Sequence, residues 1–270
     1  MSDAIDSPRW LKAQYADGRN VSARADLQSR FSTNPHPWPV WAFDQLELPD
    51  RCRILELGCG PAWLWARNLA RVPAGWEVTL SDFSTGILDE ARQALSAAGR
   101  PFSFEVIDAQ SIPFDDSSFD AVIANHMLYH VVDLDAALGE IRRVLVPGGR
   151  LFAATNGLGH MRELRELVRS VAAEMPMARE GGAANRFGLG NGAELLGAFF
   201  EDVELRRYED ALSVPDAEPL VAYVLSARDG GDLPAEKVEK LRRRLAEAIA
   251  QGGAFHITKS VGMFLAAAPA

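Results

Sequence analysis

Hydrophobic and polar residues alternate with two different periods between residues 53 and 155. Short apolar runs indicate buried strands, whereas apolar residues three and four positions apart indicate helices. Strands are predicted at 53–57, 77–81, 102–107, 119–125 and 150–155, and helices at 62–71, after Ser84 and after Asp133. Ser84 and Asp133 are predicted N-caps, and Pro147-Gly148-Gly149 should end the last helix. Such alternation predicts a parallel sheet covered by helices on both faces.

The flanking segments follow other patterns. Residues 8–48 contain Trp10, Trp38 and Trp41 without strand alternation and predict a short helical N-terminal cap. Further along, the pattern predicts helices at 158–175, 219–226 and 235–251, a glycine-rich loop at 181–192, and strands at 202–208 and 256–267. We expect the boundaries to fall at residue 50, with a cap at 1–50 and a second domain at 51–270 that carries a helix and loop insertion at about 156–195.

Composition narrows the class of protein. The 270 residues are 48% hydrophobic and carry a formal net charge of −9, which argues against a nucleic-acid surface because that needs a basic footprint. No apolar run approaches the roughly 20 residues of a membrane span, and residues 1–8 lack the apolar core of a signal peptide. The two cysteines, Cys52 and Cys59, are expected to be reduced thiols. We therefore expect a cytoplasmic protein.

Residues suited to a polar ligand follow each of the first four predicted strands. They are Glu56 with Gly58, Cys59 and Gly60, then Asp82 with Phe83, then Asp108 with Ala109, and finally Asn125. Ligands of open α/β sheets bind at the carboxyl ends of the strands. A carboxylate about 20–25 residues beyond a glycine turn can hold a ribose diol, although Asp82 or Asp108 alone could equally form a cap or a turn. Together they predict a nucleoside-sized site.

The segment Ile54-Leu55-Glu56-Leu57-Gly58-Cys59-Gly60 resembles the first motif of class I S-adenosylmethionine (SAM)-dependent methyltransferases, and the likeness covers residues 53–155. It implies a doubly wound, mostly parallel, seven-stranded Rossmann-like sheet. It also implies that Gly58 and Gly60 contact the methionine part of SAM and that Asp82 binds the ribose. Phe83 would flank the adenine, Asp108 and Ala109 would lie at its polar edge, and Asn125 would offer its backbone carbonyl to the ammonium group.

A dinucleotide-binding dehydrogenase is the alternative for this glycine turn. In that class a third glycine allows close packing of helix and strand below the pyrophosphate. Here Trp63 occupies the corresponding position, and Asp108 would have no role. The sequence therefore favours SAM.

The flanks at 31–46 and 155–161 are similar to small-molecule methyltransferases of the ubiquinone/menaquinone-biosynthesis type. The resemblance implies methyl transfer to an O, N or C atom of a small metabolite, in line with the sulfonium methyl. The candidate bases are His126, Tyr129, His130 and His160. Tyr129 could instead form a wall of the methyl-transfer cavity. The aromatic residues Trp38, Trp41, Phe43 and Tyr208 either line the acceptor site or pack the cap onto the sheet.

Several alternatives stay open from the sequence. The protein could bind SAM without transferring its methyl group, as a cyclase or isomerase, or act as a SAM-binding partner subunit. His126 and His130 lie four residues apart, a spacing that could suggest a zinc site. No third ligand is evident in the sequence, so we expect no metal. We expect a small-molecule acceptor, no nucleic acid and no membrane as partners, and either a monomer or a homodimer.

Overall fold

The computed structural model describes residues 19–178, 182–226 and 233–270. It divides the chain into two compact units. We refer to residues 38–156, 183–208 and 261–270 as the α/β unit, and to the described parts of 1–37, 157–182 and 209–260 as the helical unit. The expected cap at 1–50 is divided between these units after Pro37, and Trp10 lies outside the described residues.

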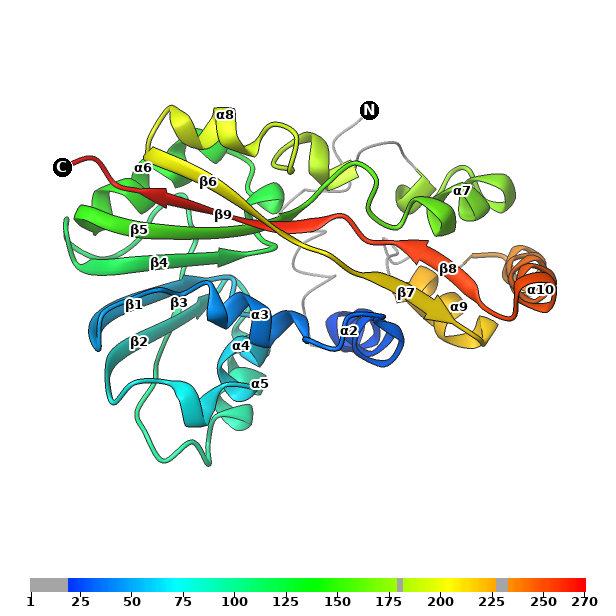
Figure 1. The fold of residues 1–270 in the computed structure, drawn as a ribbon, viewed down its shortest axis with the longest axis horizontal. Helices are drawn as coiled ribbons and strands as arrows, with labels where there is room; N and C mark the ends of the chain where they lie inside the picture. Colours follow the sequence, from blue (N-terminus) through cyan, green and yellow to red (C-terminus); the bar gives the residue numbers. More distant parts are fainter. Residues whose placement is uncertain (1–18, 179–181, 227–232) are drawn as a thin grey trace. The chain divides into compact units, whose positions relative to one another are not determined.

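A seven-stranded sheet forms the centre of the α/β unit (Figure 1). Its strands are β1 (Arg51–Leu57), β2 (Gly75–Asp82), β3 (Ser103–Val106), β4 (Phe119–Asn125), β5 (Leu145–Asn156), β6 (Glu201–Tyr208) and β9 (Val261–Ala267), in the order β3-β2-β1-β4-β5-β9-β6. Strand β9 is antiparallel to both neighbours, and the other pairs are parallel. The predicted doubly wound, mostly parallel α/β sheet is confirmed.

Both faces of this sheet are covered by helices because its strands are apolar on both sides. Leu55 belongs to the core on the side of α6 (Leu134–Val144) and α8 (Gly192–Gly197). Its neighbour Ile54 belongs to the opposite core, with α3 (Trp38–Asp44), α4 (Trp63–Ala66) and α5 (Thr85–Ala94). The predicted caps are also confirmed, since the side chains of Ser84 and Asp133 accept hydrogen bonds from the first turns of α5 and α6.

The predicted helix at 62–71 is wrong as a single element. It divides into α4 and a short 3-10 turn, η1 (Leu69–Arg71). Asn68 causes the break: its side-chain amide donates to the carbonyl of Leu64 at 2.7 Å, which is the acceptor that a continuing helix would give to the N–H of Asn68. The same amide donates to the carbonyl of Pro39 at 2.9 Å. A contact distant in sequence therefore ends the helix.

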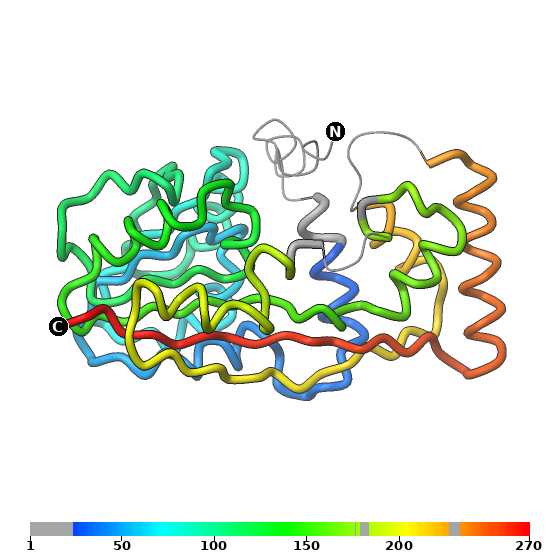
Figure 2. The backbone as a smooth tube through the Cα atoms, turned by 90° about the horizontal axis from the view of Figure 1, so that it is seen from above, coloured from blue at the N-terminus to red at the C-terminus, as the bar shows by residue number. Residues whose placement is uncertain are grey.

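The helical unit contains α2 (Arg19–Phe31), α7 (Arg162–Val171), α9 (Ala217–Ser226) and α10 (Ala235–Gly252). They share one apolar core, to which Leu27, Leu164, Leu220 and Leu245 contribute. Figure 2 traces the backbone of these helices. The predicted strand at 256–267 is two strands, because β8 (Phe255–Thr258) pairs with β7 (Ala211–Val214) in this unit and β9 joins the large sheet. Strand β7 was missed by the sequence analysis.

Short turns connect these elements, at η2 (Leu128–His130), η3 (Pro176–Ala178) and η4 (Gly182–Asn185). The predicted glycine-rich loop at 181–192 begins with η4 and ends where α8 begins. Residue 181 lies outside the described residues. Across residues 19–178, 182–226 and 233–270, every helix falls short of the length and apolarity that crossing a membrane requires.

Candidate functional site

Glu56 lies near the carboxyl end of β1 and is only 2% exposed. The indole N–H of Trp65 donates to its Oε2 at 2.6 Å, and the side-chain amide of Asn125 donates to its Oε1 at 3.4 Å. Burial raises the pKa of Glu56 to about 7, the two hydrogen bonds oppose this rise, and the charge of Asp82 adds to it. Both donors are neutral, so the burial of this carboxylate is only partly compensated.

The glycine turn after β1 is held in a left-handed conformation, with φ of +65° at Gly58 and +55° at Gly60. A Cβ atom at Gly58 would come within 2.8 Å of the Cβ of Met127, whereas one at Gly60 would meet nothing within 4 Å. Gly58 is therefore needed for the packing of the turn against the segment after β4. Gly60 instead faces open space, as the approach of a ligand to the backbone requires.

Asp82 ends β2 and turns its carboxylate back to the glycine turn. Its Oδ2 accepts from the N–H of Gly60 at 3.2 Å, and its Oδ1 accepts from the N–H of Ser84 at 3.0 Å. Burial raises the pKa of Asp82, and these backbone hydrogen bonds oppose the rise. Phe83, the next residue, is 43% exposed although it is a large apolar side chain. The structure thus brings Gly60 and Asp82 together, as the sequence analysis expects.

The third strand end is more open. The N–H of Ile107 donates to the carbonyl of Asp82 at 3.3 Å and fixes this segment beside β2. Asp108 is exposed, and its Oδ1 accepts from the backbone and the side chain of Gln110 at 3.0 and 2.9 Å. Ala109 is 5% exposed. Asp108 is therefore held locally, and its second carboxylate oxygen remains available.

Asn125, the last residue of β4, provides a feature that the sequence analysis missed. It predicts a role for the backbone carbonyl only, yet the side-chain Oδ1 is buried and has no hydrogen-bond donor among the described residues. Trp65 was missed as well. A buried glutamate needs a hydrogen-bond donor, and the helix after the glycine turn offers two indole N–H groups, those of Trp63 and Trp65. A cationic group between Glu56 and Asn125 would satisfy both side chains.

The predicted bases fall in different places. His126 follows β4 with φ of +55°, and its ring centroid lies 5.1 Å from that of Trp38. The rings of Tyr129 and His130 in η2 meet edge to face, with their centroids 4.6 Å apart. His160 belongs to the helical unit, where its Nδ1 accepts from the N–H of Ser260 at 3.4 Å. The structure places the first three in the same loop of the α/β unit.

Both cysteine side chains are buried. Burial raises the pKa of the Cys52 thiol to about 12 and that of the Cys59 thiol well above its ordinary value, and both thiols are free. No group of three His, Cys, Asp or Glu side chains with the geometry of a metal site occurs among residues 19–178, 182–226 and 233–270.

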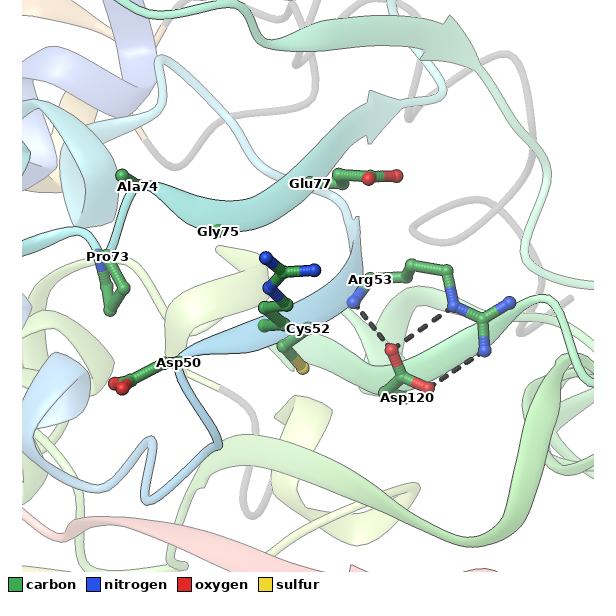
Figure 3. A pocket seen from close by; sticks show the side chains of 9 residues that line it. Asp50, Cys52, Arg53, Pro73, Ala74, Gly75, Glu77 and Asp120 are labelled. Atoms are coloured by element: carbon green, nitrogen blue, oxygen red, sulfur yellow. Dashed lines mark hydrogen bonds and ion pairs between the residues drawn. The ribbon is translucent and has the colours of Figure 1, made fainter.

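A separate hollow of about 830 Å³ lies at the amino ends of the strands (Figure 3). It is lined in part by Arg53 and Asp120, whose side chains pair at 2.8 Å. Glu56 and Asp82 lie at the other ends of their strands. This hollow is therefore distinct from the carboxyl-end site.

Comparison with known proteins agrees with this geometry. Residues 55–153 match the family model described as a methyltransferase domain. The ubiquinone/menaquinone biosynthesis C-methyltransferase of Desulfotalea psychrophila is 32% identical over 132 residues, which are 48% of this chain and 52% of that protein. The demethylmenaquinone methyltransferase of Thermus thermophilus is 41% identical over 99 residues, 37% and 44% of the two chains. This chain therefore spans only about half the length of these relatives.

This chain is therefore similar over residues 55–153 to a methyltransferase domain. Its fold is also that of phosphoethanolamine N-methyltransferase 2 of Haemonchus contortus, solved in complex with SAM, with a TM-score of 0.61 and 17% identity over 97% of this chain and 60% of that one. The methyltransferase domain contains Glu56, Asp82, Asn125 and His126. It does not contain Trp38, Trp41 or Tyr208, so the match carries no information about the acceptor.

Proposed function

We propose that this protein transfers the methyl group of SAM to an O, N or C atom of a small metabolite. Two neighbouring groups support this most directly. The buried carboxylate of Glu56 accepts hydrogen bonds from neutral donors, and the buried Oδ1 of Asn125 has no donor among the described residues. The ammonium group of SAM is the kind of cation that would satisfy both. Bound SAM would supply a sulfonium methyl, and the residues around it bind and orient the reactants.

The other strand ends fit the remaining parts of SAM. Asp82 accepts backbone hydrogen bonds from Gly60, Phe83 and Ser84, but a carboxylate has about four acceptor positions, so it can still accept from a ribose hydroxyl. The exposed ring of Phe83 offers a face to the adenine. Asp108 and Ala109 would meet the edge of the adenine, and the open turn at Gly58-Cys59-Gly60 would hold the methionine part.

His126 is the base that we favour when the acceptor must lose a proton, with His130 and Tyr129 in the same loop as the next candidates. Trp38, Trp41 and Tyr208 stack on one another with centroid distances of 5.1 to 5.3 Å and would form an aromatic wall for a flat or apolar acceptor. Phe43 is not part of this wall, because it packs against Trp65 and Trp76. His160, in the helical unit, is the fourth candidate.

Methyl-labelled SAM incubated with the protein and a cell-metabolite extract tests the proposal. We expect S-adenosylhomocysteine and a labelled small product in equal amounts. Binding of SAM without any labelled product would instead favour a cyclase, an isomerase or a SAM-binding partner subunit. Nucleic acid and lipid vesicles added as competitors should have no effect, given the net charge of −9. We also propose a cytoplasmic protein that is a monomer or a homodimer, which gel filtration with light scattering distinguishes.

The ribose assignment has its own test. Asp82→Ala should weaken the binding of S-adenosylhomocysteine by about 5- to 150-fold in titration calorimetry, because charge-assisted hydrogen bonds worth roughly 1–3 kcal/mol are lost. Asp89→Ala is the control, since this carboxylate is exposed on α5 and pairs with Arg92. Equal affinities of the two variants would refute the assignment.

A further inference from the structure

His126 is held at its backbone as well as at its ring. It adopts a left-handed conformation that only a few per cent of non-glycine residues show, and its N–H donates to the carbonyl of Ala154 at 3.0 Å. The ring lies beside Trp38 with an angle of 55° between the planes. Strained backbone of this kind persists where the surrounding structure determines it, and often at functional sites.

Trp38 is itself fixed from two sides. Its ring meets the edge of Tyr208 at 5.3 Å, and Tyr208 is 3% exposed at the end of β6. Trp41 packs on the same indole at 5.1 Å. An aromatic side chain held by two others has little freedom to change its rotamer.

The helix that carries Trp38 is also bound firmly. The buried amide of Asn68 joins the carbonyl of Pro39 in α3 to that of Leu64 in α4. Directly after α3, Glu47 forms an ion pair with Arg206 of β6 at 2.8 Å. One end of α3 is therefore tied to the helix after the glycine turn, and the segment after it is tied to the edge strand of the sheet.

We propose that Trp38 is a positioning residue that holds the imidazole of His126 in the orientation needed to accept a proton from the acceptor. This inference rests on the proposed function, because it assumes methyl transfer with His126 as the base. Trp38 acts through His126. Proton transfer requires a base within hydrogen-bond reach and correctly directed, so a freely rotating imidazole would be a poorer base.

The first test needs no acceptor. NMR spectra of the protein saturated with S-adenosylhomocysteine report the imidazole C–H resonance of His126, assigned with His126→Ala. We expect this resonance to be displaced by the ring current of Trp38, and Trp38→Leu should shift it towards the position of a mobile histidine. Trp38→Phe should keep part of the displacement, and it also replaces the leucine variant if that one does not fold. Phe43→Leu, from the side of α3 that packs on Trp65 and Trp76, should leave the resonance unchanged. No change in Trp38→Leu would overturn the inference.

The second test uses the labelled product formed from the metabolite extract. We expect Trp38→Leu to lower kcat by about 10- to 100-fold with an unchanged KM for SAM, and Trp38→Phe to restore most of the rate. In the His126→Ala background, Trp38→Leu should cause a much smaller loss than in the wild type, because both changes affect one base and only the contribution of Trp38 to the aromatic wall remains. Independent, multiplicative losses would overturn the inference. If the wild-type protein forms no product, the proposed function is refuted. The NMR experiment would then still test whether the rings of Trp38 and His126 are in contact.

Discussion

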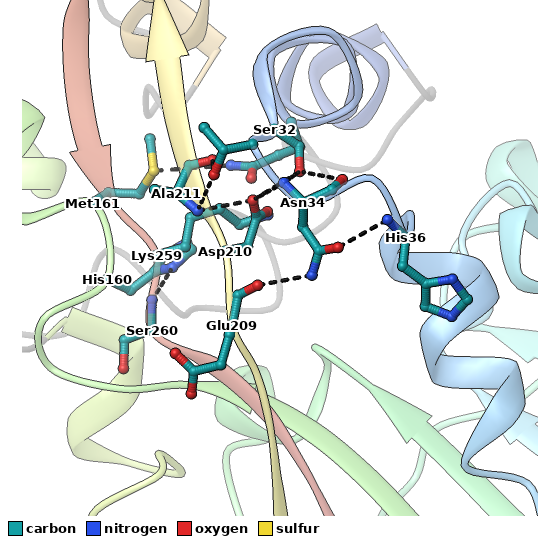
Figure 4. Close-up of polar contacts among 12 residues, drawn as sticks. Ser32, Asn34, His36, His160, Met161, Glu209, Asp210, Ala211, Lys259 and Ser260 are labelled. Atoms are coloured by element: carbon teal, nitrogen blue, oxygen red, sulfur yellow. Dashed lines mark hydrogen bonds and ion pairs between the residues drawn. The ribbon is translucent and has the colours of Figure 1, made fainter.

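Each unit contains a buried carboxylate, and the two are satisfied in different ways. In the helical unit, Asp210 is fully buried and pairs with Lys259 at 2.5 Å (Figure 4). It also accepts from the hydroxyl of Ser32 at 2.8 Å and from the N–H groups of Asn34 and Ala211 at 3.1 and 2.8 Å. In the α/β unit, Glu56 is just as inaccessible but accepts only from the neutral groups of Trp65 and Asn125.

The difference distinguishes a carboxylate whose charge is compensated within the fold from one that we propose binds the cofactor. Asp210 has its own cation, so its negative charge is compensated within the fold, and it joins the chain before α3 to the strands β7 and β8. Among the described residues Glu56 has no cationic partner, and its burial raises its pKa to about 7. A ligand that brings a positive charge would supply what the fold leaves out.

The largest effect is expected from Lys259→Met. It leaves Asp210 buried without its cation, which should lower the free energy of unfolding by about 3–5 kcal/mol in urea titrations. The added change Asp210→Asn should recover most of the loss. Lys237→Met is the control, because Lys237 pairs with Glu174 at an exposed position and such pairs contribute about 0–1 kcal/mol. Similar losses in both lysine variants would remove the basis of the comparison.

Glu56→Gln should give a smaller effect that depends on pH. The folded-state pKa of about 7 lies above the ordinary value of 4.5, so the folded protein without ligand binds this proton more tightly than the unfolded chain. Its contribution is complete below pH 4.5 and is lost as the pH rises through about 7, by roughly 3 kcal/mol at most.

Urea titrations at pH 5 and pH 8 measure this contribution. The fall in stability between the two values should be smaller in Glu56→Gln than in the wild type. Glu105→Gln, at an exposed position of β3, should fall as the wild type does. A wild type and a Glu56→Gln variant with the same pH dependence would show that the burial of Glu56 is compensated after all.

The smallest effect is expected from a pair of glycine variants. Gly60 and Gly148 have φ of +55° and +73°, and a Cβ at either would meet nothing within 4 Å. Each change to alanine should therefore destabilise the protein by about 1–2 kcal/mol through backbone strain. Only Gly60→Ala should also weaken S-adenosylhomocysteine binding in calorimetry, by about tenfold. Equal binding by both variants would contradict a ligand at the glycine turn.

Much of the cofactor site is predictable because it is encoded locally. Glu56, the glycine turn and Asp82 are each recognised from a few neighbouring residues at a strand end, and the parallel sheet brings those ends to one edge. The acceptor site is not predictable in this way. His126 and Trp38 are far apart in sequence, and no local pattern indicates that their rings meet.

The sequence by itself determined strands β1 to β5, the capped helices α5 and α6, and the order of chemical groups along the sheet edge, because these depend on periodicity and on turn residues within short segments. Only the tertiary structure decided which partner each buried group has. It ended a helix at Asn68 through Pro39, divided the last strand between two sheets, and paired Asp210 with Lys259 while giving Glu56 neutral donors. Such partners lie far away in sequence, and their proximity depends on how the whole chain packs.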